Sequence, residues 1–94
     1  MNVLILDTAD NKKISIALKI NDKKYILTQK ISSNKTQIVL PMIDKMLKKH
    51  KVKLKDIHEV EVNTGHGSFT GIRVGMAIAN ALGFVLKIPV KGFK

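Results

Sequence analysis

The spacing of apolar residues changes after the first third of the chain, and this change constrains the fold more than any other feature. Up to Ile31, apolar residues form short runs or alternate with polar ones, which is typical of β-strands. From Val39 onward they recur at intervals of three and four, which is typical of helices. A chain of this kind is expected to build a sheet first and then to pack helices on it.

Three strands are predicted in the first third. Residues 3–6 form a continuous apolar run that Asp7 ends, and such a run suits a strand buried on both faces. Residues 14–20 alternate between apolar and polar or small side chains, and a second apolar stretch covers residues 25–31. Asn21 and Asp22 separate these two segments, which predicts a β-hairpin that turns there.

The rest of the chain is predicted to alternate helices and strands. After a loop at residues 32–35, the spacing predicts a helix over 36–49, with Pro41 near its first turn or bending it. A short strand over 57–62 and a helix over 70–86 follow, and a last strand begins at Ile88. The order β-β-β-α-β-α-β predicts an α/β fold, a mixed sheet with helices packed on it.

Length and composition exclude several classes of protein. A chain of 94 residues has room for one domain, which excludes a two-lobed enzyme. The absence of cysteine excludes disulfides and thiolate metal sites, and His50, His58 and His66 fall on different predicted elements, so no metal site is expected. With no signal peptide and no run of about 20 apolar residues, a cytoplasmic protein without a membrane segment is expected.

A glycine-rich segment, residues 65–75, lies between a predicted strand and a predicted helix. Glycines permit tight turns there, and helix N-terminal amides can receive an anion. The segment lacks the Gly-Lys-Ser/Thr of a P-loop. Two interpretations stay open: Ser68 or Thr70 caps the helix, which we favour, or Gly67, Ser68 and Thr70 form a phosphate or ligand site.

Small residues repeat every four positions along the second predicted helix, at Gly71, Gly75, Ala79 and Gly83. Glycine costs about 1 kcal/mol relative to alanine inside a helix, so close packing must compensate. Packing against the domain's own sheet and packing against a partner helix both explain the stripe.

Three segments together resemble the TsaB (YeaZ) family: residues 65–75, residues 4–9, and Leu40-Pro41-Met42-Ile43. The resemblance covers essentially the whole chain, so residues 1–94 are expected to form a single N-terminal lobe with the second lobe absent. It implies a ribonuclease-H-like lobe of the actin/Hsp70/sugar-kinase ATPase type. It also implies a non-catalytic scaffold in the synthesis of threonylcarbamoyladenosine in tRNA.

The resemblance implies partners as well. Similar proteins pair through two N-lobe helices with the catalytic paralogue TsaD, or with themselves, and the ATPase TsaE binds the pair. By position, this makes the small-residue stripe an interface. The residues expected at the interface are Leu40, Pro41, Ile43, Leu47, Gly71, Gly75, Ala79 and Gly83.

An enzymatic alternative rests on the turn after the first strand. Asp7 and Thr8 lie where ATPases of this superfamily place a turn associated with metal and phosphate, so a minimal phosphotransfer lobe could bind Mg-ATP. Its residues would be Asp7, Thr8, Gly67, Ser68 and Thr70. We favour structural roles for Asp7 and Thr8, no catalytic residue and no cofactor, because the second lobe normally completes the nucleotide site.

The sequence departs from the family pattern at three positions. His66 replaces the usual proline, Lys35 replaces the usual histidine, and Glu61 replaces a small apolar residue. Glu61 also shares one face of its strand with Glu59. A solvated or partner-facing side explains these two glutamates better than a catalytic pair, because no nucleophile or base lies near them in the sequence.

The formal net charge of +10 raises nucleic acid as a partner. Arg73 is the only arginine and aromatic residues are few, which discounts a dedicated nucleic-acid module. A tRNA-facing surface is an alternative for the lysines of residues 45–55, but we favour a lysine-rich composition as the explanation. That cluster consists of Lys45, Lys48, Lys49, Lys51, Lys53 and Lys55.

Overall fold

The computed structural model describes residues 1–31 and 35–94, and it confirms the predicted order of elements. Residues 32–34, part of the predicted loop, lie outside the described residues. The elements are β1 (Asn2–Asp7), β2 (Lys13–Ile20), β3 (Lys23–Lys30), α1 (Lys35–Lys49), the short 3-10 helix η1 (Leu54–Asp56), β4 (Glu59–Asn63), α2 (Phe69–Leu86) and β5 (Val90–Phe93).

The strands form one mixed sheet of five strands in the order β3-β2-β1-β4-β5. β1 pairs antiparallel with β2 and parallel with β4, and β4 pairs parallel with β5. The predicted hairpin is confirmed: Ile20 pairs with Lys23, and Asn21 takes a left-handed φ of 54° in the turn. Because asparagine tolerates this conformation better than most residues, the turn fixes the register of β2 against β3.

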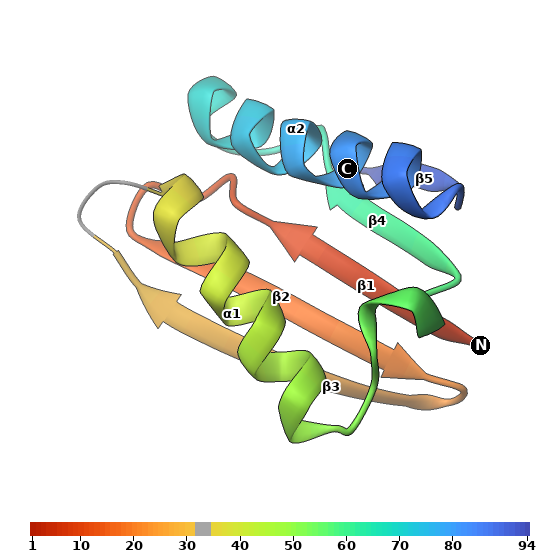
Figure 1. Ribbon diagram of the computed structural model, residues 1–94. Helices are drawn as coiled ribbons and strands as arrows, with labels where there is room; N and C mark the ends of the chain where they lie inside the picture. Colours follow the sequence, from red (N-terminus) through yellow and green to blue (C-terminus); the bar gives the residue numbers. More distant parts are fainter. Residues whose placement is uncertain (32–34) are drawn as a thin grey trace.

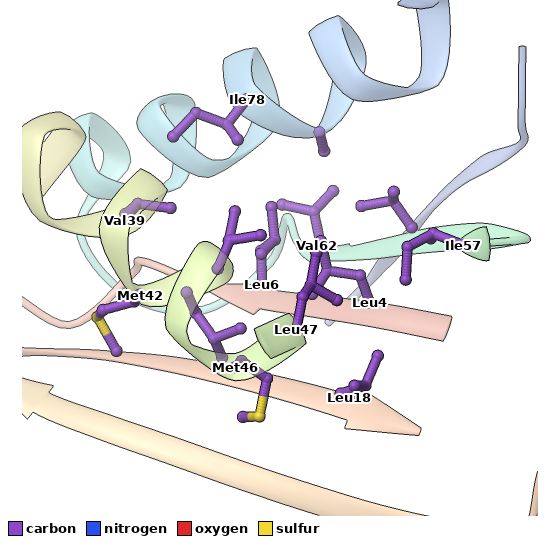
Figure 2. Packing of buried hydrophobic residues seen from close by; sticks show 14 of the residues in the cluster. Leu4, Leu6, Leu18, Val39, Met42, Met46, Leu47, Ile57, Val62 and Ile78 are labelled. Atoms are coloured by element: carbon purple, nitrogen blue, oxygen red, sulfur yellow. The ribbon is translucent and has the colours of Figure 1, made fainter. Parts of the chain in front are cut away.

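The core lies between the sheet and the two helices. Both helices cover the same face of the sheet (Figure 1). Alternate strand residues point toward them, among them Leu4 and Leu6 of β1, Ile16 of β2 and Val62 of β4. Figure 2 shows Leu4, Leu6 and Val62 of the sheet beside Leu47, Met46 and other apolar side chains of the helices. The apolar residues that alternate along the strands and those spaced by three and four along the helices therefore pack into one core.

The expectation that β1 is buried on both faces is only half right. Val3 is buried and Ile5 is half-buried on the face away from the helices, although no helix in the described part of the chain covers that face. Neighbouring strands carry Glu59, Glu61 and Lys91 on the same face. A continuous apolar run therefore overstated how much of β1 is covered.

Pro41 lies in the interior of α1 rather than in its first turn. Its ring is exposed, whereas Val39, Met42 and Ile43 on the opposite side face the core. The missing amide of Pro41 removes one hydrogen bond from the solvent side of the helix, where water can satisfy the free carbonyl.

Helix α2 is the most apolar element. Its 18 residues are long and apolar enough to cross a membrane by length and composition alone, which contradicts the expectation that no segment approaches such a span. Packing accounts for part of this composition, because Gly71, Gly75, Ile78 and Ala79 are buried. The remaining apolar residues are left on the outer side of the helix.

Candidate functional site

A polar pocket of about 320 Å³ lies where β1 and β4 end. This is the edge of a parallel pair at which α/β proteins commonly bind ligands. Two predicted site residues, Asp7 and Gly67, line the pocket. The others that line it are Ala9, Asp10, Lys13, Ser15, Asn63 and His66.

Asn63, which the sequence did not single out, organises this pocket. Its side-chain amide donates to Asp7 Oδ1 and to the carbonyl of His66, both at 3.1 Å. Its carbonyl oxygen accepts from the amides of Gly65 at 3.0 Å and His66 at 3.3 Å. An asparagine before a Gly-rich turn is the signal that could have identified it, because this side chain often bonds to the backbone two residues on.

Three of the predicted ligand residues, Asp7, Thr8 and Ser68, have structural partners. Thr8 is buried, and its hydroxyl donates to the carbonyl of Gly71 at 2.5 Å. Ser68 is the N-cap of α2 and accepts from the amide of Gly71 at 3.2 Å, whereas Thr70 is exposed in the first turn. Asp7 Oδ1 also accepts from the amide of Ala9 at 3.1 Å. The favoured interpretation, a helix cap at Ser68, is confirmed.

These contacts do not fit the phosphates of a nucleotide. Asp7 and Asp10 place two carboxylates in the pocket against the single ammonium of Lys13, so its charge opposes an anion. Ser68 Oγ accepts from the Gly71 amide in the helix cap, which accounts for this residue without a ligand. In residues 1–31 and 35–94, no group of three His, Cys, Asp or Glu side chains could hold a metal ion.

The small-residue stripe of α2 packs against the domain's own sheet. A Cβ atom on Gly75 would lie 2.6 Å from Thr8 Oγ1 and 3.2 Å from Val62 Cγ2. A Cβ on Gly71 would collide with the Thr8 carbonyl oxygen, and one on Gly83 would collide with Val90. Ala79 is fully buried. The prediction placed the partner contact on the wrong side of α2, because the stripe faces the sheet and glycine is needed there to bring α2 close to β1, β4 and β5.

The side of α2 opposite the stripe carries exposed apolar residues that are free to contact a partner. Phe84 is 85% exposed, Phe69 73%, Val85 71% and Met76 37%. Arg73 lies over the Phe69 ring, 5.6 Å from its centroid. We call these five residues the α2 outer face. When a helix is apolar on all sides and packs one side on its own sheet, its other side is available to a partner. The apolar residues all round α2 were the sequence signal for this surface.

An apolar groove lies between α1 and α2, on the side of α2 that carries Leu82. It has a volume of about 380 Å³ and is lined by Leu40, Ile43 and Leu47 of α1, Leu82 of α2 and the connecting residue Leu54, together with Asp44, Lys48, Val52 and Lys53. Leu40 is 52% exposed, whereas Ile43 and Leu47 belong to the core and line only the floor of the groove.

The four α1 residues predicted at the interface thus divide into two groups. Leu40, Ile43 and Leu47 line the groove beside α2. Pro41 instead lines a separate hollow toward β3 with Gln29. A partner seated across α1 and α2 would contact Leu40 without contacting Pro41.

The two predicted glutamates lie on the helix-free face of the sheet. Glu59 is buried, and the Lys91 ammonium lies 3.0 Å from its Oε1. Lys91 holds the pKa of Glu59 below its usual value, against the effect of burial. Burial, and then the neighbouring Glu59 carboxylate, raise the pKa of Glu61. The arrangement is an ion pair with an adjacent carboxylate, without a nucleophile.

Replacing Lys91 by methionine is expected to lower the melting temperature at neutral pH. A carboxyl whose pKa is lowered by folding stabilises the folded state above its unfolded pKa, and this stabilisation is lost as pH falls through the folded pKa. The difference between K91M and the parent should therefore shrink under acidic conditions, measured by thermal unfolding across a pH series. K12M, which removes an exposed lysine elsewhere, is the control. A K91M deficit that stays constant with pH would contradict the assignment.

Comparisons with known proteins give a consistent answer. The sequence model of the family described as "TsaD: tRNA N6-adenosine threonylcarbamoyltransferase" matches residues 13–93. The chain is 38% identical over 90 residues to the "tRNA threonylcarbamoyladenosine biosynthesis protein TsaB" of Buchnera aphidicola subsp. Schizaphis graminum, covering 96% of this chain and 42% of that protein. It is 33% identical to the TsaB protein of Escherichia coli, covering 98% of this chain and 39% of that one.

Solved structures agree with the sequence matches. YeaZ from Pseudomonas aeruginosa superposes with a TM-score of 0.92 at 28% identity, over 99% of this chain and 43% of that one. RuvC from Thermus thermophilus superposes with a TM-score of 0.57 at 11% identity, over 99% of this chain and 63% of that one, which shows a shared fold alone. The chain spans about two fifths of the length of the TsaB proteins it matches.

Proposed function

Because the chain belongs to the TsaD family and, within it, to the TsaB (YeaZ) group, we propose that it is a non-catalytic partner of a TsaD-like catalytic subunit in tRNA threonylcarbamoyladenosine synthesis. The observation that carries this proposal is the α2 outer face. Three of its apolar side chains are more than two thirds exposed: Phe69, Phe84 and Val85. They lie at the two ends of α2, and large apolar side chains exposed along an unpartnered helix suit a binding role.

The composition of this surface suits a protein interface. Two phenylalanines, a methionine and an arginine belong to the residue types enriched at interfaces, and aromatic anchors carry much of the binding energy. The groove with Leu40 and Leu54 offers a hollow beside these anchors. The proposed pairing surface therefore runs from the α2 outer face to Leu40 across the groove.

The site at the ends of β1 and β4 supports a non-catalytic role. The Thr8 and Ser68 hydroxyls are held by backbone groups of α2, and Glu59 is held by Lys91. A nucleophile needs a free hydroxyl, thiol or amine within reach of a base. We accordingly place catalysis in the partner.

The same surface accounts for self-pairing, whereas the third partner in the proposal needs the heterodimer. A second copy of the chain could occupy it when the catalytic subunit is absent, because a two-fold interface uses one patch on both molecules. A TsaE-like ATPase would bind the heterodimer rather than this chain alone. Either assembly buries Phe84, which makes this residue the best single probe.

Replacing Phe84 by aspartate is expected to weaken pairing with the TsaD-like subunit of the same organism at least about tenfold, because it puts a charge at the centre of the interface. Size-exclusion chromatography with light scattering, at micromolar concentrations of both proteins, measures this. Phe84 is 85% exposed, so the fold should persist.

Ile26 provides the matched control, since it is 64% exposed but lies on β3, away from α2. I26D should pair as the parent does. Equal pairing by F84D and the parent, or loss of pairing by I26D alone, would place the interface elsewhere. Absence of both heterodimer and homodimer for the parent would refute the proposal.

A further inference from the structure

One end of the molecule gathers the N-terminus, the β2–β3 turn and the connection between α1 and β4 (Figure 1). Backbone hydrogen bonds hold these segments together: the Asn21 amide donates to the Met1 carbonyl at 3.0 Å, and the His58 amide donates to the Asn2 carbonyl at 2.8 Å. This end is opposite the pocket of Asp7 and Asn63, because β1 begins at the first and finishes at the second.

Exposed lysines concentrate at this end. Nine of the chain's 17 basic residues lie on the end of β2, the start of β3, the C-terminal half of α1 and the connection after it. We call these nine residues the basic end. They are Lys19, Lys23, Lys24, Lys45, Lys48, Lys49, Lys51, Lys53 and Lys55, and all are exposed.

Few acidic residues lie within the segments of the basic end, although Lys19 also interacts with Glu59 and Glu61 of β4. Asp44 is paired with Lys48 at 3.0 Å, and Asp56 accepts from the Lys53 amide at 3.2 Å, leaving Asp22 as the third acid of these segments. A lysine-rich composition would spread the lysines over the surface. The structure instead brings together two segments, residues 19–24 and 45–55, that are separate in the sequence.

The contact between Tyr25 and His50 joins these two segments. Their ring centroids are 4.1 Å apart, which ties the start of β3 to the end of α1. Lys23 and Lys24 precede Tyr25, and Lys49 and Lys51 flank His50. Lys23 shares the strand face of Tyr25, so it lies on the same side of the sheet as Lys49 and Lys51, whereas Lys24 lies on the opposite face beside Lys19. Lysines from two elements therefore surround this end of the molecule, which suits a partner with phosphates spaced along a backbone.

We propose that the basic end binds the sugar–phosphate backbone of a structured RNA. Lysine neutralises phosphate as a point charge and needs no fixed geometry, so the scarcity of arginine does not prevent backbone binding, although it opposes base readout. The choice of RNA among polyanions rests on the proposed place of the chain in tRNA modification. The basic end adjoins the pairing surface at Lys48 and Lys53, which line the groove, whereas Lys23, Lys24, Lys49 and Lys51 do not line it.

An anionic membrane carries negative charge as RNA does, but the positions of the exposed apolar side chains favour membrane binding less than RNA binding. The three most exposed, Phe84, Phe69 and Val85, lie on α2, whereas the lysines of the basic end lie on β2, β3, α1 and the connection after α1. A membrane-binding surface usually combines both kinds of residue on one amphipathic face. Vesicle binding is therefore an outcome of the test rather than the proposal.

Fluorescence anisotropy with a labelled tRNA transcript, over a series of salt concentrations, tests the proposal on the chain alone. We expect binding that weakens steeply with salt, and a log–log slope reduced by about one for each contacting lysine removed. K23Q/K24Q and K49Q/K51Q should each weaken binding about tenfold at about 0.1 M salt. K12Q/K13Q removes the same charge at the opposite end of β2 and should have less than about a twofold effect.

Three results would overturn the proposal: no salt-dependent binding by the parent, equal losses in the K12Q/K13Q control, or binding to phosphatidylserine vesicles without binding to tRNA. Because the first needs no variant, the test does not depend on whether the variants fold. F84D should retain tRNA binding. Failure of RNA binding would therefore leave the pairing proposal standing, and failure of pairing would leave this one standing.

Discussion

Replacing Gly75 by leucine is expected to destabilise the protein by about 3 kcal/mol or more, a large part of the stability of a small domain. The β-carbon alone would lie 2.6 Å from Thr8 Oγ1 and 3.2 Å from Val62 Cγ2, and both neighbours are buried. Moving Thr8 away would break its hydrogen bond to the Gly71 carbonyl. Moving α2 away would open the core. Chemical denaturation followed by circular dichroism measures the loss.

The control for this prediction lies two residues along the same helix. Ala77 is exposed, so A77L adds a similar side chain and similar helix propensity without touching the sheet. We expect A77L to unfold within about 0.5 kcal/mol of the parent. A folded, stable G75L protein would show that the stripe does not hold α2 against the sheet, and would restore the partner-interface interpretation of these glycines.

Replacing Asn63 by alanine is expected to cost about 2–3 kcal/mol of stability. Its side chain makes four hydrogen bonds, to Asp7, to the Gly65 amide and to both backbone groups of His66. Asn63 is buried, so alanine removes all four bonds and leaves its site unfilled, although Gly65 and His66 are exposed and water can take up part of the lost bonding. A melting temperature about 10 °C lower is the corresponding observation.

An aspartate at the same position separates the two halves of this network. N63D keeps the acceptor for the amides of Gly65 and His66 but loses both donated bonds and puts a carboxylate beside Asp7. We expect N63D to be less stable than the parent at neutral pH and to recover in acid, where the repulsion is removed. If N63A and N63D both match the parent, Asn63 does not organise the loop.

The secondary structure could be predicted because each element carries its own period. Alternation of apolar and polar residues identified β2, and apolar spacings of three and four identified α1. Burial of one face of a strand or a helix imposes these periods on the local sequence. The predicted hairpin at Asn21 and Asp22 is confirmed for a similar reason, because turn chemistry is local. The family followed from residues 65–75, where a cap, a turn and a close helix contact constrain nearly every position.

The pairing surface could not be predicted in the same way, because the period of a helix does not say which face meets the sheet. The four-residue stripe of α2 fits either side, and distances from Gly75 to Thr8 and Val62 decide the question. The bonds of Asn63 depend on where β1 and β4 end in space. The basic end likewise joins Tyr25 to His50 across the fold, a pairing that neither segment shows alone.

The central claim is that this chain pairs through the α2 outer face, and photocross-linking tests it most directly. Benzoylphenylalanine in place of Phe84 adds a reactive group to a side chain that is already 85% exposed, and the same residue in place of Ile26 is the control on β3. With the TsaD-like subunit present, irradiation should give a covalent heterodimer from position 84 and none from position 26. An adduct from position 26, or none from position 84 when the two proteins co-elute, would contradict the account.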